Sequence, residues 1–369
     1  MKRGLAVVAL CLLLSLTLTG CWDQLSLKKQ LFVDIVGVDY AGESKRLAVS
    51  FVIASLREAN QGGGKPSSLY MNATGESLYD SATRINQDLP GILSVQQTRL
   101  YLISPRFAKD EPLTGLSASG QFISNPLYAY LAMYDGDLSK LLSKKKVHDQ
   151  TINDYLIGVL DDQLKRGRIP SNKMLHYILG GEELVNDFAL NLFEPSGEGA
   201  RLAGTALFRD GKYTGIKLDN EETLLACLLN GTGAANQPLN GQVEGKPYTV
   251  QVQQAKHDFR FVFNKEGLRE IDLSLKLGVK LVEDGHFERK HTKQTRAKME
   301  KAIEADLDSM AATLIAKLQK ANCDYFQLGH ELAAYHPKLY KGMNWRVQYP
   351  KLAIKPNVKI TILNTGVLE

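Results

Sequence analysis

The stretch Ile271-Asp272-Leu273-Ser274-Leu275-Lys276-Leu277-Gly278-Val279-Lys280-Leu281 alternates apolar residues with polar or small ones along its whole length. Because successive side chains of a β-strand point to opposite faces of a sheet, this period of two predicts a strand with one buried face. The segments 248–254, 259–263 and 358–362 show the same alternation. We therefore expect a sheet with one apolar face in the C-terminal third of the chain.

A long helix is expected before the last of these strands. Its apolar residues recur at helical spacing and share one face: Ile303, Leu307, Met310, Leu314 and Leu318. Several strands together with one long helix indicate an antiparallel α+β unit. The expected fold class is therefore α+β, a multi-domain mixed α/β chain with mainly antiparallel sheets and a long helix packed on the C-terminal sheet.

The N-terminal half mixes strands with helices. The apolar runs 31–40 and 47–55 flank a short turn, so they are expected to pair as a hairpin. Ser77 is typical of a helix N-cap, and helical spacing follows it until Pro90. Further strands are expected at 99–103 and 128–134, and a further helix at 151–164.

Domain boundaries are expected from length and composition. A chain of 369 residues exceeds the size at which one core usually stops growing. Residues 194–199, Glu-Pro-Ser-Gly-Glu-Gly, are typical of a linker. Asp210-Gly211 lies between two strand-like runs and predicts a hairpin turn. The expected units are a signal peptide at 1–20, an N-terminal domain at 21–195, a small β-rich middle domain at 200–245 and a C-terminal α+β domain at 246–369.

The N-terminus carries the pattern of a bacterial lipoprotein signal. Lys2-Arg3 and a short apolar run lead to the tetrad Leu18-Thr19-Gly20-Cys21, which is a lipobox. We therefore expect cleavage before Cys21 and a diacylglycerol on its sulfur, with the rest of the chain as an ectodomain. The alternative is an uncleaved membrane span, but the apolar run is shorter than the roughly 20 residues that a span needs.

Composition limits the classes of function. The chain is 44% hydrophobic and 23% charged, as in ordinary globular proteins, and its net charge of +5 is too small to argue for a nucleic-acid partner. With Cys11 removed and Cys21 lipidated, Cys227 and Cys323 remain. One disulfide between them is possible, although the apolar run around Cys227 favours a buried free thiol.

Catalytic and cofactor motifs are missing from the sequence. It has no Gly-x-Ser-x-Gly elbow, no phosphate-binding glycine loop and no His-Glu-x-x-His. Cys323, His330 and His336 are the one candidate metal set, and their spacing matches no standard zinc pattern. We therefore expect no catalytic residue, no bound cofactor and no metal site, and the chain is not expected to be an enzyme.

Several motifs together resemble a known family. They are Gly20-Cys21-Trp22-Asp23, the segment 204–212, Asp324-x-Phe326-x-x-Gly329, His336-Pro337, Trp345 and Thr365-Gly366. In this order they resemble the C-subunit lipoproteins of spore germinant receptors, the Ger(x)C family, over essentially the whole chain. Gly329 is expected to adopt a positive φ or a tight turn. Trp345 is expected to pack in a core rather than to contact a ligand.

The resemblance implies a function. Such a protein is anchored by lipid at Cys21 to the outer face of the cytoplasmic (spore inner) membrane, beside two multi-spanning receptor subunits. It is a non-enzymatic subunit needed for assembly or signalling of a receptor that senses nutrients and triggers germination. The resemblance leaves open whether this subunit contacts the small molecule itself.

A lipid-anchored solute-binding protein of a transporter is the alternative. It predicts two lobes with regular βαβ alternation and a cleft between them. The grouped strands of period two in the C-terminal half favour hairpins instead. An envelope hydrolase is a more distant alternative, because the sequence offers no nucleophile–base pair.

Overall fold

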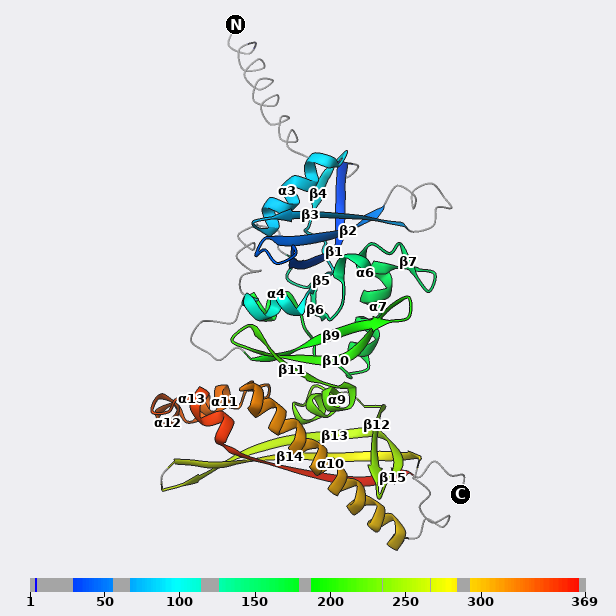
Figure 1. Cartoon of the computed structure of the whole chain (residues 1–369). Coiled ribbons are helices and arrows are strands. Elements are labelled where there is room, and N and C mark those ends of the chain that lie inside the picture. The colour runs from blue at the N-terminus through cyan, green and yellow to red at the C-terminus, as the bar shows by residue number, and fades with distance from the viewer. Residues whose placement is uncertain are drawn as a thin grey trace.

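The computed structural model describes residue 4 and the ranges 29–55, 67–113, 126–178, 187–233, 235–265, 267–283 and 293–364. Two sheets, one of nine strands and one of four, dominate this part of the chain (Figure 1). Most strand pairs are antiparallel, and helices pack on both sheets. The predicted α+β class with several sheets is therefore confirmed.

The nine-stranded sheet has a parallel centre flanked by antiparallel hairpins. Its order is β11-β10-β9-β6-β5-β1-β2-β3, and the short β4 pairs with the start of β1. β1, β5, β6 and β9 run parallel, whereas β1–β2–β3 and β9–β10–β11 are antiparallel, so the expected hairpin of 31–40 with 47–55 is confirmed. The strands are β1 (Gln30–Tyr40), β2 (Leu47–Ser55), β3 (Ser67–Gly75), β4 (Ile92–Ser94), β5 (Leu100–Ile103), β6 (Tyr130–Tyr134), β9 (Phe188–Ser196), β10 (Gly199–Arg209) and β11 (Lys212–Leu218).

Helices cover both faces of this sheet, which explains why the parallel strands β5 and β6 are apolar at every position. One core contains α3 (Leu78–Asp88), α4 (Pro105–Asp110) and α8 (Met174–Ile178). The core on the opposite face contains α6 (Leu138–Leu142), α7 (Ile152–Lys165) and the small hairpin β7 (Lys146–Val147) with β8 (Gln150–Thr151). The predicted N-cap of α3 is confirmed, because the Ser77 side chain accepts the Asp80 N–H.

The four-stranded sheet contains the stretch on which the fold prediction rests. Its order is β12 (Gln237–Val243), β13 (Lys246–Asn264), β14 (Gly267–Glu283) and β15 (Ala353–Asn364), with β15 parallel to β14. All the apolar residues that alternate in 271–281 are buried on one face of β14. The segments 248–254 and 259–263, expected as two strands, are one strand. A β-bulge between Val252 and Gln254 reverses which residues face the core, so the sequence pattern breaks where the strand continues.

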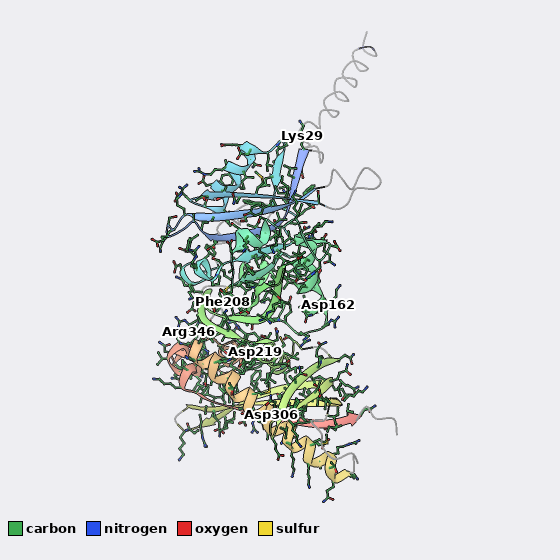
Figure 2. The ribbon with its side chains drawn as sticks, turned by 45° about the vertical axis from the view of Figure 1, so that its right-hand side comes forward. Lys29, Asp162, Phe208, Asp219, Asp306 and Arg346 are labelled. Carbon is green, nitrogen blue, oxygen red and sulfur yellow. The ribbon has the colours of Figure 1, made fainter. Side chains whose placement is uncertain are left out.

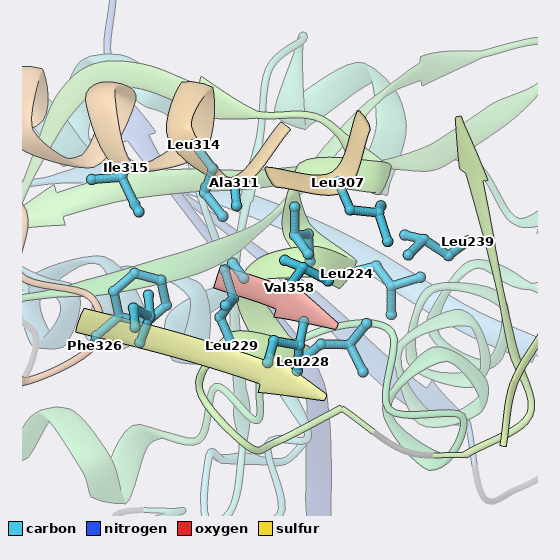
Figure 3. Packing of buried hydrophobic residues seen from close by; sticks show 14 of the residues in the cluster. Leu224, Leu228, Leu229, Leu239, Leu307, Ala311, Leu314, Ile315, Phe326 and Val358 are labelled. Carbon is cyan, nitrogen blue, oxygen red and sulfur yellow. The ribbon is translucent and has the colours of Figure 1, made fainter. Parts of the chain in front are cut away.

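Two helices pack on the apolar face of the four-stranded sheet. α10 (Lys293–Ala321) is the predicted long helix, and α9 (Asn220–Leu229) lies between the two sheets (Figure 1). Leucines of α9 and α10 meet β12 and β15 in one core, as Figure 3 shows. Leu207 and Leu218 of the nine-stranded sheet belong to the same core, so it continues across the junction. Four short helices follow α10: α11 (Leu328–Tyr335), α12 (Pro337–Lys341), α13 (Trp345–Gln348) and η3 (Tyr349–Lys351).

The expected linker at 194–199 is wrong. These residues end β9 and start β10, and Ser196 pairs with Gly199 across a tight turn in which Gly197 has a φ of +51°. Glycine and proline are as typical of hairpin turns as of linkers, so composition alone could not separate the two. The expected middle unit at 200–245 is divided, because β10 and β11 join the nine-stranded sheet and β12 joins the other. Along the chain, α9 lies between the last strand of the nine-stranded sheet and the first strand of the four-stranded sheet.

Some sequence predictions fall outside the described residues. They are the signal peptide at 1–20, the lipidation site Cys21 and the terminal Thr365-Gly366. Within the described ranges, no helix is long and apolar enough to cross a membrane.

Candidate functional site

The two sheet units meet at a polar cluster, which we call the junction cluster: Asp187, Asp210, Asp324, Trp345 and Arg346. Asp187, Asp324 and Trp345 are buried, whereas Asp210 lies at the surface. Asp187 lies just before β9, and Asp210 lies in the β10–β11 turn. The other three follow α10 in the C-terminal unit. Figure 2 shows Arg346 close to the level at which the two units join. The cluster therefore connects segments that are far apart in the chain.

Asp187 and Arg346 form the central ion pair of the junction cluster. The Asp187 side chain is completely buried, and Arg346 donates from Nη1 to Oδ2 at 2.6 Å and from Nη2 to Oδ1 at 2.8 Å. Arg346 also donates to a carboxylate oxygen of Asp210. Burial alone would lower the pKa of Arg346, but its hydrogen bonds to Asp187 and Asp210 outweigh burial and raise that pKa. The guanidinium therefore stays charged in its two-pronged contact with Asp187.

Asp324 continues the cluster toward the helices that follow α10. Its carboxylate accepts the backbone N–H of Leu328 at 3.0 Å, that of Gly329 at 2.7 Å and the indole N–H of Trp345 at 3.0 Å. Its own backbone N–H donates to Asp187 Oδ2 at 2.7 Å. Burial raises the pKa of Asp324 to about 6, even though these three donors favour the charged form.

Gly329 was predicted to have a positive φ or to form a tight turn, but glycine is required at this position for another reason. Gly329 lies in the first turn of α11 and does not have a positive φ; Gln327, two residues earlier, has a φ of +56°. A Cβ at Gly329 would lie 2.7 Å from Trp345 Nε1. Glycine is needed here because the indole ring packs directly against the helix. Trp345 is 4% exposed and lies beside the ring of Tyr349, as expected of a core residue.

The predicted turn at Asp210-Gly211 is confirmed and takes part in the cluster. Both residues have positive φ, +49° and +75°, as the tight two-residue hairpin turns of this type require. The backbone N–H of Asp210 donates to Asp187 Oδ1 at 3.2 Å. The turn therefore brings a carboxylate and a backbone donor to the junction.

Cys227 and Cys323 are both buried and both free, so the possible disulfide is not formed. Burial raises the pKa of the Cys227 thiol to about 11, which leaves it in the unreactive protonated form at neutral pH. In the described ranges, no three His, Cys, Asp or Glu side chains are arranged to hold a metal ion. Of the candidate metal set, His336 packs its ring on Phe263 at 4.7 Å between centroids.

Sequence reasoning missed Asp187 and Arg346. Asp187 and Arg346 lie 159 positions apart in the chain, and no local sequence spacing predicts a contact over such a separation. It also missed Asp34, which is 8% exposed in β1 and accepts both Nε and Nη2 of Arg99 at 3.1 and 2.9 Å. The available signal was an isolated carboxylate in or beside an apolar strand, since a charge in such a place needs a partner.

Comparison with known proteins covers almost the whole chain. The model for the spore germination protein N-terminal domain matches residues 23–192, and the model described as spore germination B3/GerAC like, C-terminal, matches residues 203–366. The spore germination protein GerQC of Bacillus cereus is 21% identical over 377 residues, with both chains fully covered. YfkR of Bacillus subtilis (strain 168), also named after spore germination, is 19% identical, with 100% of this chain and 98% of YfkR covered.

Among solved structures, the crystal structure of the GerBC protein is similar with a TM-score of 0.56. The match covers 89% of this chain and 97% of GerBC, at 13% identity. At that identity the likeness concerns the fold alone. The C-terminal match contains Asp210, Asp324 and Arg346, whereas Asp187 lies in the N-terminal match. The junction cluster therefore draws on both matched regions.

Proposed function

Because this chain belongs to the Ger(x)C family of spore germination proteins, we propose that it is a non-enzymatic, lipid-anchored subunit of a spore nutrient germinant receptor. The observation that carries this proposal is the succession of the two germination family matches, at 23–192 and 203–366, along one chain. The subunit acts in assembly or signalling of the receptor complex.

The proposed anchor is Cys21. Two acyl chains give stable membrane attachment where one gives only marginal binding. A diacylglycerol at this position holds the first described strand, β1, near the outer face of the cytoplasmic membrane. The proposed partners are the two multi-spanning subunits of the receptor, which lie in the same membrane.

The proposed role in assembly or signalling is supported by the junction cluster. Asp187 comes from the nine-stranded unit and Arg346 from the other, and breaking a buried ion pair by removing one partner costs about 3–5 kcal/mol. A body whose two halves are held in this way transmits a movement at one end to the other. The solute-binding alternative, by contrast, expects two lobes of regular βαβ units. In the four-stranded sheet, hairpins connect β12, β13 and β14, and only β15 is reached through helices.

Germination of spores lacking this gene tests the proposal. We expect loss of the response to a subset of amino acids or sugars, with normal sporulation, and full recovery with the wild-type gene. Cys21→Ala is expected to lose membrane retention and to restore the response only weakly. A normal response of the deletion strain to every nutrient would contradict the receptor function, and full membrane retention of Cys21→Ala would contradict the anchor.

A further inference from the structure

Both edges of the four-stranded sheet are closed by helix carboxylates. At β15, Val358 N–H donates to Asp308 at 2.7 Å, Ile360 N–H to Glu304 at 2.9 Å and Ile362 N–H to Glu300 at 2.8 Å. Every fourth residue of a helix advances about 6 Å and every second residue of a strand about 6.6 Å, so the two rows match. At β12, Gln242 N–H donates to Asp306 at 3.2 Å. These contacts satisfy backbone groups that would otherwise pair with another chain.

One edge of the nine-stranded sheet is also protected. Helices α4 and α10 pack against β11, and the Thr214 hydroxyl accepts the Ile216 N–H at 3.3 Å. Lys212 and Lys217 add charge along this strand. Charged side chains and covering helices are the usual means by which edge strands avoid unwanted pairing.

β3, at the opposite edge, has α3 packed on one face of the sheet, but it lacks the charged side chains of β11. Its nine residues, Ser-Ser-Leu-Tyr-Met-Asn-Ala-Thr-Gly, include no charged residue and no proline. Within the described ranges β3 pairs with β2 alone, and no other backbone group or side chain bonds to its main chain. Leu69 in this strand is 44% exposed. An edge of this length, with uncharged side chains, is a template for one more strand.

The open edge lies at the end of the molecule where the described chain begins. Figure 1 shows β3 and β4 at one end of the molecule and the four-stranded sheet at the other, and Figure 2 shows Lys29 at the end away from the four-stranded sheet. Seven residues lie between Cys21 and Lys29, and a fully extended chain spans at most about 28 Å over this interval. With the lipid on Cys21, the edge of β3 therefore lies close to the membrane surface.

We propose that β3 pairs with an extended segment of a multi-spanning receptor subunit at the point where that segment leaves the membrane. This inference rests on the proposed function and names the surface through which it acts. Main-chain hydrogen bonds supply the affinity of such an added strand, and its alternate side chains extend the two faces of the sheet. Met71 and Ala73 lie on the face covered by α3, so the added strand places an apolar side chain beside Leu69 on that face.

A second copy of this chain fits the same edge poorly. Antiparallel self-pairing of β3 relates the two copies by a two-fold axis normal to the sheet. The copies would then extend in opposite directions from the shared edge, with both Lys29 ends, labelled in Figure 2, near the middle. One membrane surface cannot anchor both copies in that arrangement, which favours a membrane-embedded partner.

Photo-crosslinking in spore membranes tests the proposal on the full chain. A benzophenone amino acid replaces Leu69 in β3 or, as the matched control, Leu363 in β15, which is 45% exposed on a strand whose edge is closed. We expect the probe at Leu69 to join an extramembrane segment of a multi-spanning subunit, identified by mass spectrometry, and the probe at Leu363 not to join it. Crosslinking at Leu69 to a second copy, to lipid only, or equally from both positions would overturn the proposal.

A charge in the edge gives the second arm of the test. Leu69→Lys is expected to fold, because the side chain is 44% exposed, and to lower co-isolation of the multi-spanning subunits by about tenfold. Leu363→Lys is expected to leave co-isolation unchanged. If deletion abolishes a nutrient response but Leu69→Lys co-isolates like wild type, the receptor function stands and the β3 proposal fails. If deletion has no effect, the receptor function fails, and the crosslink from Leu69 alone decides the β3 proposal.

Discussion

The charge of Arg346 is compensated mainly by Asp187, a carboxylate that is completely buried. Arg346→Ala removes both hydrogen bonds to Asp187 and leaves that carboxylate buried and unpaired. We expect the free energy of unfolding to fall by about 3–5 kcal/mol, measured by urea denaturation. The control is Arg260→Ala, since Arg260 is 76% exposed in its pair with Asp272 and an exposed ion pair adds little to stability. Equal losses in the two variants would contradict a structural role for the buried pair.

Asp324 gives the junction a specific pH dependence. The pKa of its carboxyl is about 6 in the folded chain against 3.8 for the ordinary group. Between these values the folded state binds more protons than the unfolded state, so the free energy of unfolding falls as the pH rises from about 4 to about 6. The expected change is about 3 kcal/mol, and stability is level above this window.

Asp324→Asn isolates this contribution, because the amide does not titrate. We expect the difference in unfolding free energy, wild type minus variant, to decrease as the pH rises through the window. Asp80→Asn is the control of opposite sign, since a backbone hydrogen bond from Glu76 and the contact with Arg84 lower the pKa of Asp80. A difference that is independent of pH for Asp324→Asn would show that this carboxyl titrates normally in the folded chain.

At single positions, the sequence predicted the local role of a residue better than it predicted the residue's contacts with distant parts of the chain. Trp345 and the Asp210-Gly211 turn were predicted correctly because a large aromatic residue and a turn dipeptide are local signals. Gly329 was assigned the wrong reason, because its constraint comes from the indole of a residue 16 positions later. The pairing of Asp187 with Arg346 depends on the packing of two whole units, which no spacing along the chain encodes.

Among the elements, α10 has two roles: its apolar face packs on the four-stranded sheet, and its carboxylates bind the edge of β15. Only the first role was predicted from the sequence. The apolar face of α10 was predicted from the helical spacing, whereas no role was predicted for Glu300, Glu304 and Asp308. These carboxylates accept backbone N–H groups of β15. The spacing of four in a helix and the spacing of two in a strand coincide only when the helix lies along the edge. That placement is decided by tertiary packing.

Replacing the three carboxylates together with alanine (Glu300→Ala, Glu304→Ala and Asp308→Ala) should open the edge of β15. Each lost hydrogen bond to a charged acceptor removes about 1.5–3 kcal/mol, and the exposed edge can pair with another molecule. We expect lower stability and self-association that increases with protein concentration, measured by sedimentation velocity. The isosteric variant Glu300→Gln, Glu304→Gln and Asp308→Asn keeps an acceptor oxygen at each position, so it should self-associate less than the alanine variant. An alanine variant as stable and as dispersed as wild type would show that the carboxylates do not protect the edge.

At the scale of the whole molecule, the sequence predicted the C-terminal sheet and its helix but not how the strands between 188 and 243 divide between the two sheets. The compositional signal at 194–199 marks a hairpin turn, whereas α9, a helix buried on all sides, divides the units. An all-round apolar helix is typical of a segment enclosed by protein on every side. The sequence showed that Cys227 lies in an apolar run, but not that two separate sheets enclose it.

This shared core predicts that the two units unfold together. α9 packs on β10 and β11 as well as on β13 and β14, and its leucines share one core with residues of both sheets. We expect β6 and β14 to lose protection from hydrogen exchange at the same urea concentration in the wild-type chain. Leu228→Ala, at a fully buried position of α9, should lower stability by about 2–5 kcal/mol and separate the two midpoints.

The matched control for this prediction is Leu156→Ala in α7. Leu156 is also fully buried, but it belongs to a core formed by the nine-stranded unit alone. Its loss should destabilise β6 by a similar amount and, because the junction is intact, leave β14 coupled to β6. If β6 and β14 unfold at different urea concentrations in the wild-type chain, the units are independent, and a movement at one end is not carried to the other through α9 and the junction cluster. Coincident midpoints in wild type that separate in Leu228→Ala but not in Leu156→Ala would assign that coupling to α9.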